Sequence, residues 1–266
     1  MQQPIHRSPL RRALGQLYYT TKTHLSWFFA YTPFATNQTT DQLPTTIYQH
    51  STPLRRPLAN VPEQMQENKI KNLALAIDTI DGLIIKPGET FSYWKSIGKP
   101  TKRRGFADGM ILYCGTMTYG VGGGLCQLSN LIYWMTLHTP LTITERWRHS
   151  YDVFPDVSRT QPFGSGATCS YPNIDLKIQN NTDQTFQLYL KLTDTHLIGE
   201  WRAQHDIPYS YNIIEKEHHI IHEPFGAYSR NNTIVREVID TQTHEIIAKE
   251  FVTKNCALMM YNPLLD

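Results

Sequence analysis

The spacing of apolar residues predicts a helix near the start of the chain. From Ser8 to Tyr31 these residues recur at intervals of three and four, and Ser8 followed by Pro9 suits a helix start. We expect the apolar stripe of this helix to pack on the rest of the protein. The alternative is that this basic amphipathic helix docks on a membrane surface. The stripe comprises Leu10, Leu14, Leu17, Tyr18, Leu25, Phe28 and Phe29.

Two further helices are predicted, at residues 64–81 and 125–137. The second of these lies between a Gly-rich segment and Pro140, which ends it. Residues 32–62 are rich in Pro, Thr, Asn and Gln and show no period beyond a short strand candidate at residues 45–49. They predict a long irregular connection.

Alternation of apolar and polar residues predicts strands elsewhere, with short ones at residues 83–85, 91–94 and 110–113. Residues 174–178 and 186–192 alternate on either side of a turn at residues 180–183, which predicts a β-hairpin. Similar runs at residues 197–201, 233–239 and 245–252 predict a strand-rich C-terminal half. The fold class is therefore α+β: N-terminal helices, then a central helix that starts at the Gly-rich segment and packs on a mostly antiparallel β-sheet.

Composition narrows the classes of function. A chain of 266 residues with 40% hydrophobic and 18% charged residues is typical of a globular protein. The net charge is +2, and the basic clusters at residues 7–12 and 102–104 are not interleaved with aromatic residues, so we expect no nucleic-acid partner. No run of about 18 apolar residues occurs, so no membrane span is expected. Without an apolar leader, we expect a cytoplasmic protein.

The cysteines are Cys114, Cys126, Cys169 and Cys256, far apart and without a CxxC pair. A disulfide scaffold and a structural zinc site are therefore not expected, and the thiols should be reduced. A cluster of histidines (His218, His219 and His222) lies in a strand-like run without an acidic partner at metal-ligand spacing, so no metal site is expected. The Gly-rich segment lacks the Lys-Ser/Thr ending of a phosphate loop, so no cofactor is expected.

Cys126 is the candidate nucleophile. Gly122, Gly123 and Gly124 precede it, and the predicted helix places it in the first turn, where free N–H groups and the helix dipole favour a thiolate. The glycines would let a ligand approach the main chain. The structural alternative is a buried free cysteine beside glycines that only permit close packing.

A nucleophilic cysteine needs a base and an orienting group. His149 enters the strand region and is the candidate base, and Asp175, on the polar face of a predicted strand, is the candidate orienter. Asp152 and Asp156 are rivals for the orienting role.

Three polar residues complete the candidate site as binding groups. The backbone N–H of Gln127 could form an oxyanion site with that of Cys126. Asn130 shares a helix face with Cys126 through their i,i+4 spacing, and Arg148 adjoins the candidate base.

Several strings together resemble the VanW family. They are Lys86-Pro87-Gly88-Glu89-Thr90-Phe91-Ser92, Gly122-Gly123-Gly124-Leu125-Cys126-Gln127-Leu128-Ser129-Asn130, Glu145-Arg146 with Arg148-His149-Ser150, and Asp175-Leu176-Lys177-Ile178 with Asn180-Asn181-Thr182. The resemblance covers about residues 5–205 and implies an association with vancomycin (glycopeptide) antibiotic resistance and the cell envelope, or cell wall. It suggests three parts: residues 1–62 as an N-terminal helical segment and irregular connection, residues 63–205 as a VanW-like core, and residues 206–266 as a β-rich extension.

The order of Cys at a helix start, then His, then Asp also resembles papain-like and transglutaminase-like proteins, from which it departs in the spacings. The leading hypothesis is a cysteine-dependent acyl-transfer or hydrolytic enzyme acting on a peptide-like or amide substrate. The alternative is a non-catalytic accessory or binding protein, in which the glycines and aromatic walls form a groove for a peptide-like or envelope-related ligand. The sequence leaves the oligomeric state open.

Overall fold

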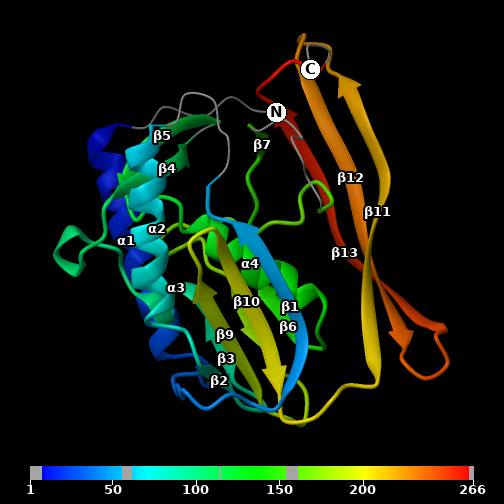
Figure 1. Ribbon diagram of the computed structural model, residues 1–266. Helices are drawn as coiled ribbons and strands as arrows, with labels where there is room; N and C mark the ends of the chain where they lie inside the picture. Colours follow the sequence, from blue (N-terminus) through cyan, green and yellow to red (C-terminus); the bar gives the residue numbers. More distant parts are fainter. Residues whose placement is uncertain (1–7, 56–61, 114, 154–160, 264–266) are drawn as a thin grey trace.

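The computed structural model describes residues 8–55, 62–113, 115–153 and 161–263 and confirms an α+β fold (Figure 1). The first helix, α1, runs over Pro9–Phe28 and begins at Ser8, whose side chain accepts a hydrogen bond from the N–H of Arg11. The next elements are strand β1 (Thr45–Pro53) and helix α2 (Glu63–Ile77).

The main sheet is antiparallel, with the strand order β1-β10-β9-β2. Its other members are β2 (Leu83–Ile85), β9 (Phe186–Leu192) and β10 (His196–Ala203). Helix α4 (Cys126–Leu137) packs on this sheet, because Gly199 of β10 leaves room for the side chains of Leu131 and Met135. Trp201 of β10 is fully buried and donates from Nε1 to Thr136 Oγ1 on α4, at 3.0 Å. The predicted packing of a central helix on an antiparallel sheet is confirmed.

Smaller sheets flank this core. One has the order β3-β8-β6, formed by β3 (Thr90–Ser92), β8 (Lys177–Gln179) and β6 (Thr142–Glu145), and another pairs β4 (Asp108–Tyr113) with β5 (Thr116–Val121). The strand expected at residues 91–94 is shorter, since helix α3 (Tyr93–Ile97) begins directly after Ser92. Ser92 Oγ accepts from the N–H of Lys95, which caps this helix, and a single turn of 3-10 helix follows at Lys102–Arg104.

The predicted β-hairpin of residues 174–192 is wrong. The turn between the two runs exists, but β8 pairs with β3 and β6, whereas β9 pairs with β10 and β2. The buried amide of Asn180 donates to the carbonyl oxygens of Ile85 and Gln184, each at 2.8 Å, and so fixes the chain where it passes between the sheets. Alternation shows which residues face a core but does not name the pairing partner.

The C-terminal part forms a separate sheet with the order β11-β12-β13-β7. Its long strands are β11 (Tyr209–His222), β12 (Tyr228–Asp240) and β13 (Ile246–Met259), which stand beside the main body in Figure 1. The short strand β7 (Tyr151–Asp152) joins β13 in parallel. Strands therefore pair across both expected boundaries, β1 with β10 and β7 with β13.

The prediction that the stripe of α1 packs on the protein body is wrong. No residue of α1 is buried, and the exposed fractions of Leu10, Leu14 and Leu17 are 70%, 59% and 64%. The helix instead meets the body through another face: Thr23 Oγ1 donates to Asn173 Oδ1 at 2.8 Å, and His24 Nε2 lies 2.9 Å from the hydroxyl of Tyr171. Within the described residues, no helix is long and apolar enough to cross a membrane.

Candidate functional site

Cys126 is the first residue of α4, as predicted, and is half-buried. Its Sγ atom lies 3.7 Å from each of three atoms: Oγ1 of Thr168, the carbonyl oxygen of Cys169 and Sγ of Cys169. The segment at residues 168–169 therefore forms one wall of the thiol site.

His149 reaches the same place. Its Nε2 atom lies 2.9 Å from Thr168 Oγ1, so one hydroxyl contacts both the imidazole and the thiol. The backbone enforces this contact, because Trp147 and Thr168 form an antiparallel bridge in which the N–H of Thr168 donates to the carbonyl of Trp147 at 2.9 Å. The structure thus brings together Cys126 and His149, which are 23 residues apart in the sequence.

The thiol of Cys126 is acidic. Contact with the Cys169 thiol holds the pKa of Cys126 well below its usual range, against the opposing effect of burial, and contact with the His149 imidazole lowers it further. At Cys169 burial is the largest effect, and it raises the pKa of that thiol well above its usual range. A thiolate at a helix start beside a histidine can act as a nucleophile.

Three side chains hold the segment at residues 164–169, which carries this wall. Asn130, one turn along α4, accepts from the N–H of Ala167 at 2.7 Å, and Ser129 donates to the carbonyl of Ala167, also at 2.7 Å. Arg146 donates to the carbonyls of Gly164 and Gly166, and its guanidinium carbon lies 4.8 Å from the centre of the Tyr133 ring. The predicted binding residue Asn130 therefore positions the wall of the site.

Sequence reasoning missed Thr168, Cys169 and Arg146 as site residues. Arg146 stands in one of the strings that resemble the family, which was a usable signal. Thr168 and Cys169 lie 42 and 43 residues after Cys126, and no local pattern connects such distant positions.

Asp175, the expected orienter of His149, is buried and makes other contacts. Its carboxylate accepts from the hydroxyl of Ser92 at 2.6 Å and from the N–H groups of Trp94 and Leu176, each at 2.9 Å. Burial raises the pKa of Asp175 to about 6, against the lowering effect of these hydrogen bonds. Asp175 thus supports the start of α3, while Thr168 makes the contact with His149.

Only one of the two rival carboxylates lies in the described part of the chain. Asp152, in β7, is buried, accepts from the hydroxyl of Tyr261 at 2.9 Å and lies 3.6 Å from Arg230. Asp156 lies outside the described residues.

The three glycines before Cys126 are packed against protein atoms. A Cβ on Gly122 would meet Pro100, one on Gly123 would lie 2.1 Å from the backbone of Gly109, and one on Gly124 would meet Lys69. These close contacts explain why glycine is needed at the three positions, since the run lets the chain pass closely between β4 and α2.

Gln127 and Arg148 also make structural contacts. Gln127 donates from its side chain to Thr52 Oγ1 at 3.0 Å, and its backbone N–H donates to the carbonyl of Gly124 at 3.0 Å. The predicted oxyanion role would require that backbone bond to be given up. Arg148 donates to the carbonyl of Cys256 in β13 at 3.0 Å.

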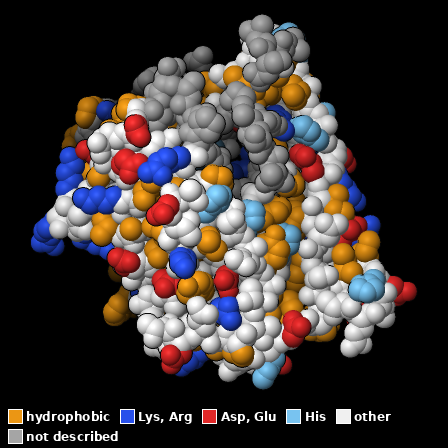
Figure 2. Space-filling model, in the orientation of Figure 1, with side chains coloured by type: hydrophobic (Ala, Val, Ile, Leu, Met, Phe, Trp, Pro, Cys, Tyr) orange, Lys and Arg blue, Asp and Glu red, His pale blue; other side chains and the backbone are white. Residues whose placement is uncertain are grey.

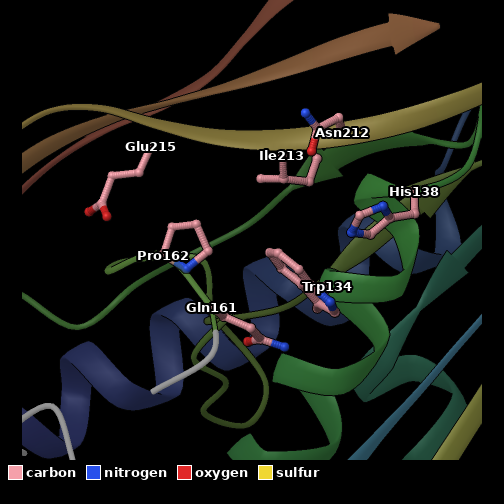
Figure 3. Close-up of a pocket in the computed structure, with 7 residues that line it drawn as sticks. All are labelled: Trp134, His138, Gln161, Pro162, Asn212, Ile213 and Glu215. Carbon is pink, nitrogen blue, oxygen red and sulfur yellow. The ribbon is translucent and has the colours of Figure 1, made fainter. Parts of the chain in front are cut away.

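A cavity of about 430 Å³ lies further along α4, where the helix faces β11 (Figure 3). Trp134 is two turns from Cys126, roughly 12 Å along the helix axis. His138 stacks on Tyr48, and burial lowers the pKa of His138 to about 4. Hydrophobic side chains gather on the surface between the body and the C-terminal sheet (Figure 2). The cavity is lined by Trp134, His138, Gln161, Pro162, Asn212, Ile213 and Glu215.

No group of three or more His, Cys, Asp or Glu residues in the described part of the chain is arranged to hold a metal ion. His218, in β11, accepts instead from Nε of Arg230 at 2.9 Å.

Fold and site together define an α+β protein with an acidic thiol at a helix start, beside a threonine and a histidine. The family model described as VanW like protein matches residues 68–202, a range that includes Cys126, His149, Thr168 and Cys169. The chain belongs to the VanW family.

Two curated relatives support this assignment. The Vancomycin B-type resistance protein VanW of Enterococcus faecalis is 39% identical over 194 residues, which cover 73% of this chain and 70% of the relative. The Uncharacterized protein YoaR of Bacillus subtilis is 31% identical over 125 residues, which cover 47% of this chain and 40% of that protein. No solved structure matches the chain.

Proposed function

We propose that this chain is a cysteine-dependent enzyme of acyl transfer or hydrolysis with a peptide-like or amide substrate. The observation that carries the proposal is the contact series Cys126, Thr168 and His149 at the start of α4. The thiol proton passes to the Thr168 hydroxyl while that hydroxyl gives its own proton to Nε2 of His149.

The reaction then follows ordinary thiol chemistry. The Cys126 thiolate attacks the carbonyl carbon, the bond to the leaving amine breaks, and the amine takes the proton from His149. The thioester left on Cys126 is released by water in hydrolysis or by an acceptor amine in transfer. Thr168 lies between the thiol and the imidazole as a proton relay, a role that differs from the orienting role the sequence hypothesis gave to Asp175.

An acylation experiment tests this chemistry. The background variant Cys114→Ser/Cys256→Ser is treated with 4-nitrophenyl acetate, an activated ester, and the acetyl adduct is located by peptide mass spectrometry. We expect the adduct on Cys126, with release slowed in His149→Ala. An adduct spread over Cys126 and Cys169 alike, or none on Cys126, contradicts the proposal.

We also propose that the protein serves vancomycin resistance and acts at the cell envelope. The support is the identity of 39% with a relative named as a vancomycin resistance protein. Susceptibility of a host strain to vancomycin is compared between the parent and Cys126→Ala at matched protein levels. We expect lower resistance with Cys126→Ala.

The cytoplasmic location stays a proposal. Its support is that the four cysteines are far apart in the sequence and form no CxxC pair, a pattern not typical of a secreted disulfide scaffold. Fractionation that finds the full chain in the culture medium would overturn it.

A non-catalytic accessory role is the second candidate. One observation favours it: a cavity lies along α4 away from the thiol. Resistance that is unchanged in Cys126→Ala but lost when Ile213→Trp fills the cavity would favour this role.

A further inference from the structure

Two thiols face each other at the start of α4. Sγ of Cys126 lies 3.7 Å from Sγ of Cys169, and neither residue is in a disulfide. A disulfide bond is about 2.0 Å long, so side-chain rotations that bring the two sulfurs about 1.7 Å closer would allow a bond.

The two thiols differ in environment as an attacking and a resolving cysteine do. Cys126 is at a helix start and touches Thr168, which carries the link to His149. Cys169 contacts the hydroxyl of Ser129, and burial raises the pKa of its thiol, which favours the neutral form. A small-molecule disulfide would therefore react first with Cys126, whose pKa is lowered.

We propose that Cys126 and Cys169 form a thiol–disulfide exchange site, with Cys126 as the attacking thiolate, Cys169 as the resolving thiol and a small-molecule disulfide as the co-reactant. The inference rests on the proposed function only in taking Cys126 as the reactive nucleophile. It needs no acyl substrate.

The exchange balances in two steps. The Cys126 thiolate attacks the disulfide RSSR, a bond forms between Cys126 and one RS group, and the other leaves as RS⁻. Cys169 then loses its proton, attacks the Cys126 sulfur and displaces the second RS⁻. The two protein thiols are oxidised to one disulfide, and RSSR is reduced to two RSH, which take up the protons of both cysteines.

The first step prepares the second. Contact with the Cys126 thiolate is one cause of the raised pKa of Cys169, because two adjacent negative charges repel each other. Once Cys126 is part of a mixed disulfide it is neutral, and this cause is removed. Cys169 becomes easier to ionise at the moment when it has to attack.

Glutathione disulfide is a suitable probe. In the Cys114→Ser/Cys256→Ser background we expect intact mass spectrometry to show an internal disulfide and no bound glutathione. The matched variant with Cys169→Ser added should retain one glutathione on Cys126, and the variant with Cys126→Ser added should retain none. Retained glutathione in the background variant, as in Cys169→Ser, would show that Cys169 does not resolve and would overturn the inference.

Comparison with the acetylation experiment separates this inference from the proposed function. Acetylation of Cys126 without formation of the internal disulfide leaves the acyl-transfer proposal standing and ends the exchange proposal. An internal disulfide without any acetyl adduct leaves the exchange proposal standing and ends the acyl-transfer proposal.

The outward face of α1 carries a second inference. Its apolar stripe points away from the body, with exposed fractions of 61% at Tyr18 and 80% at Phe28. The helix contains no Asp or Glu. At about 100° per residue, Arg11 and Lys22 fall along the border of the stripe.

We infer that α1 lies on a membrane surface that contains anionic lipids. The apolar stripe would enter the boundary between headgroups and acyl chains, and Arg11 and Lys22 would meet the lipid phosphates. The contacts of Thr23 and His24 with the body keep this face turned outward.

Sedimentation with vesicles tests the membrane inference. We expect the protein to sediment with phosphatidylglycerol vesicles and much less with phosphatidylcholine vesicles. Binding should be lost in Leu14→Asp/Leu17→Asp and kept in Ile247→Asp, a control at an exposed apolar residue of β13. No sedimentation with the anionic vesicles, or a dimer without vesicles that Leu14→Asp/Leu17→Asp abolishes, would overturn it, and the dimer would identify a second copy as the occupant.

Discussion

His149 and Thr168 are joined by a contact of 2.9 Å between the imidazole Nε2 and the hydroxyl Oγ1, and that hydroxyl is 3.7 Å from the thiol of Cys126. Trp147 and Thr168 form an antiparallel bridge, and His149 follows Trp147 by two positions. The bridge therefore holds His149 beside Thr168. The threonine therefore couples the histidine to the thiol through a single oxygen atom.

Thr168→Val removes that oxygen and keeps the shape of the side chain. We expect iodoacetamide to alkylate Cys126 about fivefold more slowly at neutral pH, since a lost hydrogen bond is worth about 1 kcal/mol. The rate is measured with Cys114 and Cys256 changed to Ser. Thr168→Ser, which keeps the hydroxyl, should react like the parent; equal rates for the Val variant and the parent would show that Thr168 is not a link.

His149→Ala should raise the pKa of Cys126 towards the value of about 8.5 for a free thiol, because the imidazole is one cause of the lowered pKa. The rise is partial, since the helix start and Cys169 remain. The thiolate is the reactive form, so alkylation should slow near neutral pH and approach the parent rate at high pH. His205→Ala, at an exposed histidine, is the control. Coinciding pH profiles for His149→Ala and the parent would exclude His149 as the partner.

Asp175→Ala should lower the free energy of unfolding by about 1–3 kcal/mol, because the N–H of Trp94 and the hydroxyl of Ser92 lose a buried acceptor. Denaturant unfolding measures this change. The alkylation rate of Cys126 in the folded variant should stay at the parent value. A slower alkylation with unchanged stability would instead support the orienting role expected from the sequence.

The same carboxyl group predicts a pH dependence of stability. The pKa of Asp175 is about 6 in the folded protein, above its usual value of 3.8, so the folded state holds this proton more tightly. The contribution of Asp175 to stability is therefore largest below pH 4 and decreases as the pH rises to 6. Asp175→Asn should remove this decrease when unfolding is followed from pH 4 to pH 7.

Leu14→Asp should leave the melting temperature nearly unchanged, with an effect below about 0.5 kcal/mol, since Leu14 is exposed on α1. Trp27→Ala, on the face that packs against the core, should lower it clearly. Thermal unfolding by circular dichroism compares the two. A large loss of stability in Leu14→Asp would mean that the stripe is covered by protein.

Local patterns allowed the elements to be predicted better than their pairing. The strand at residues 83–85 and the start of α4 at Cys126 agree with the sequence, because apolar period and glycine punctuation act over a few residues. The partners of β8 and β9 were assigned wrongly, since pairing depends on the whole core. The stripe of α1 was placed correctly on one face of a helix, but its period could not show whether that face meets protein or solvent.

Two members of the candidate site were predictable from the sequence. Cys126 and His149 stand out through the helix start and the imidazole, and the structure brings them to one place. No local sequence pattern marks Thr168 and Cys169. They reach the site because Asn130 binds the N–H of Ala167 and so positions their segment. Asp175 has the right residue type for an orienter, but its oxygens are occupied at the start of α3.

The pairing of β7 with β13 ties the thiol site to a strand that lies outside the family match. Ser150, next to His149, accepts from the N–H of Leu258, and Arg148 binds the carbonyl of Cys256, so β13 holds the histidine from both sides. These two contacts keep the imidazole near the thiol, so attachment of β13 should favour ionisation of Cys126. Thermodynamic reciprocity then requires the converse: formation of the thiolate strengthens the attachment of the C-terminal strand, and chemical capping of the sulfur loosens it.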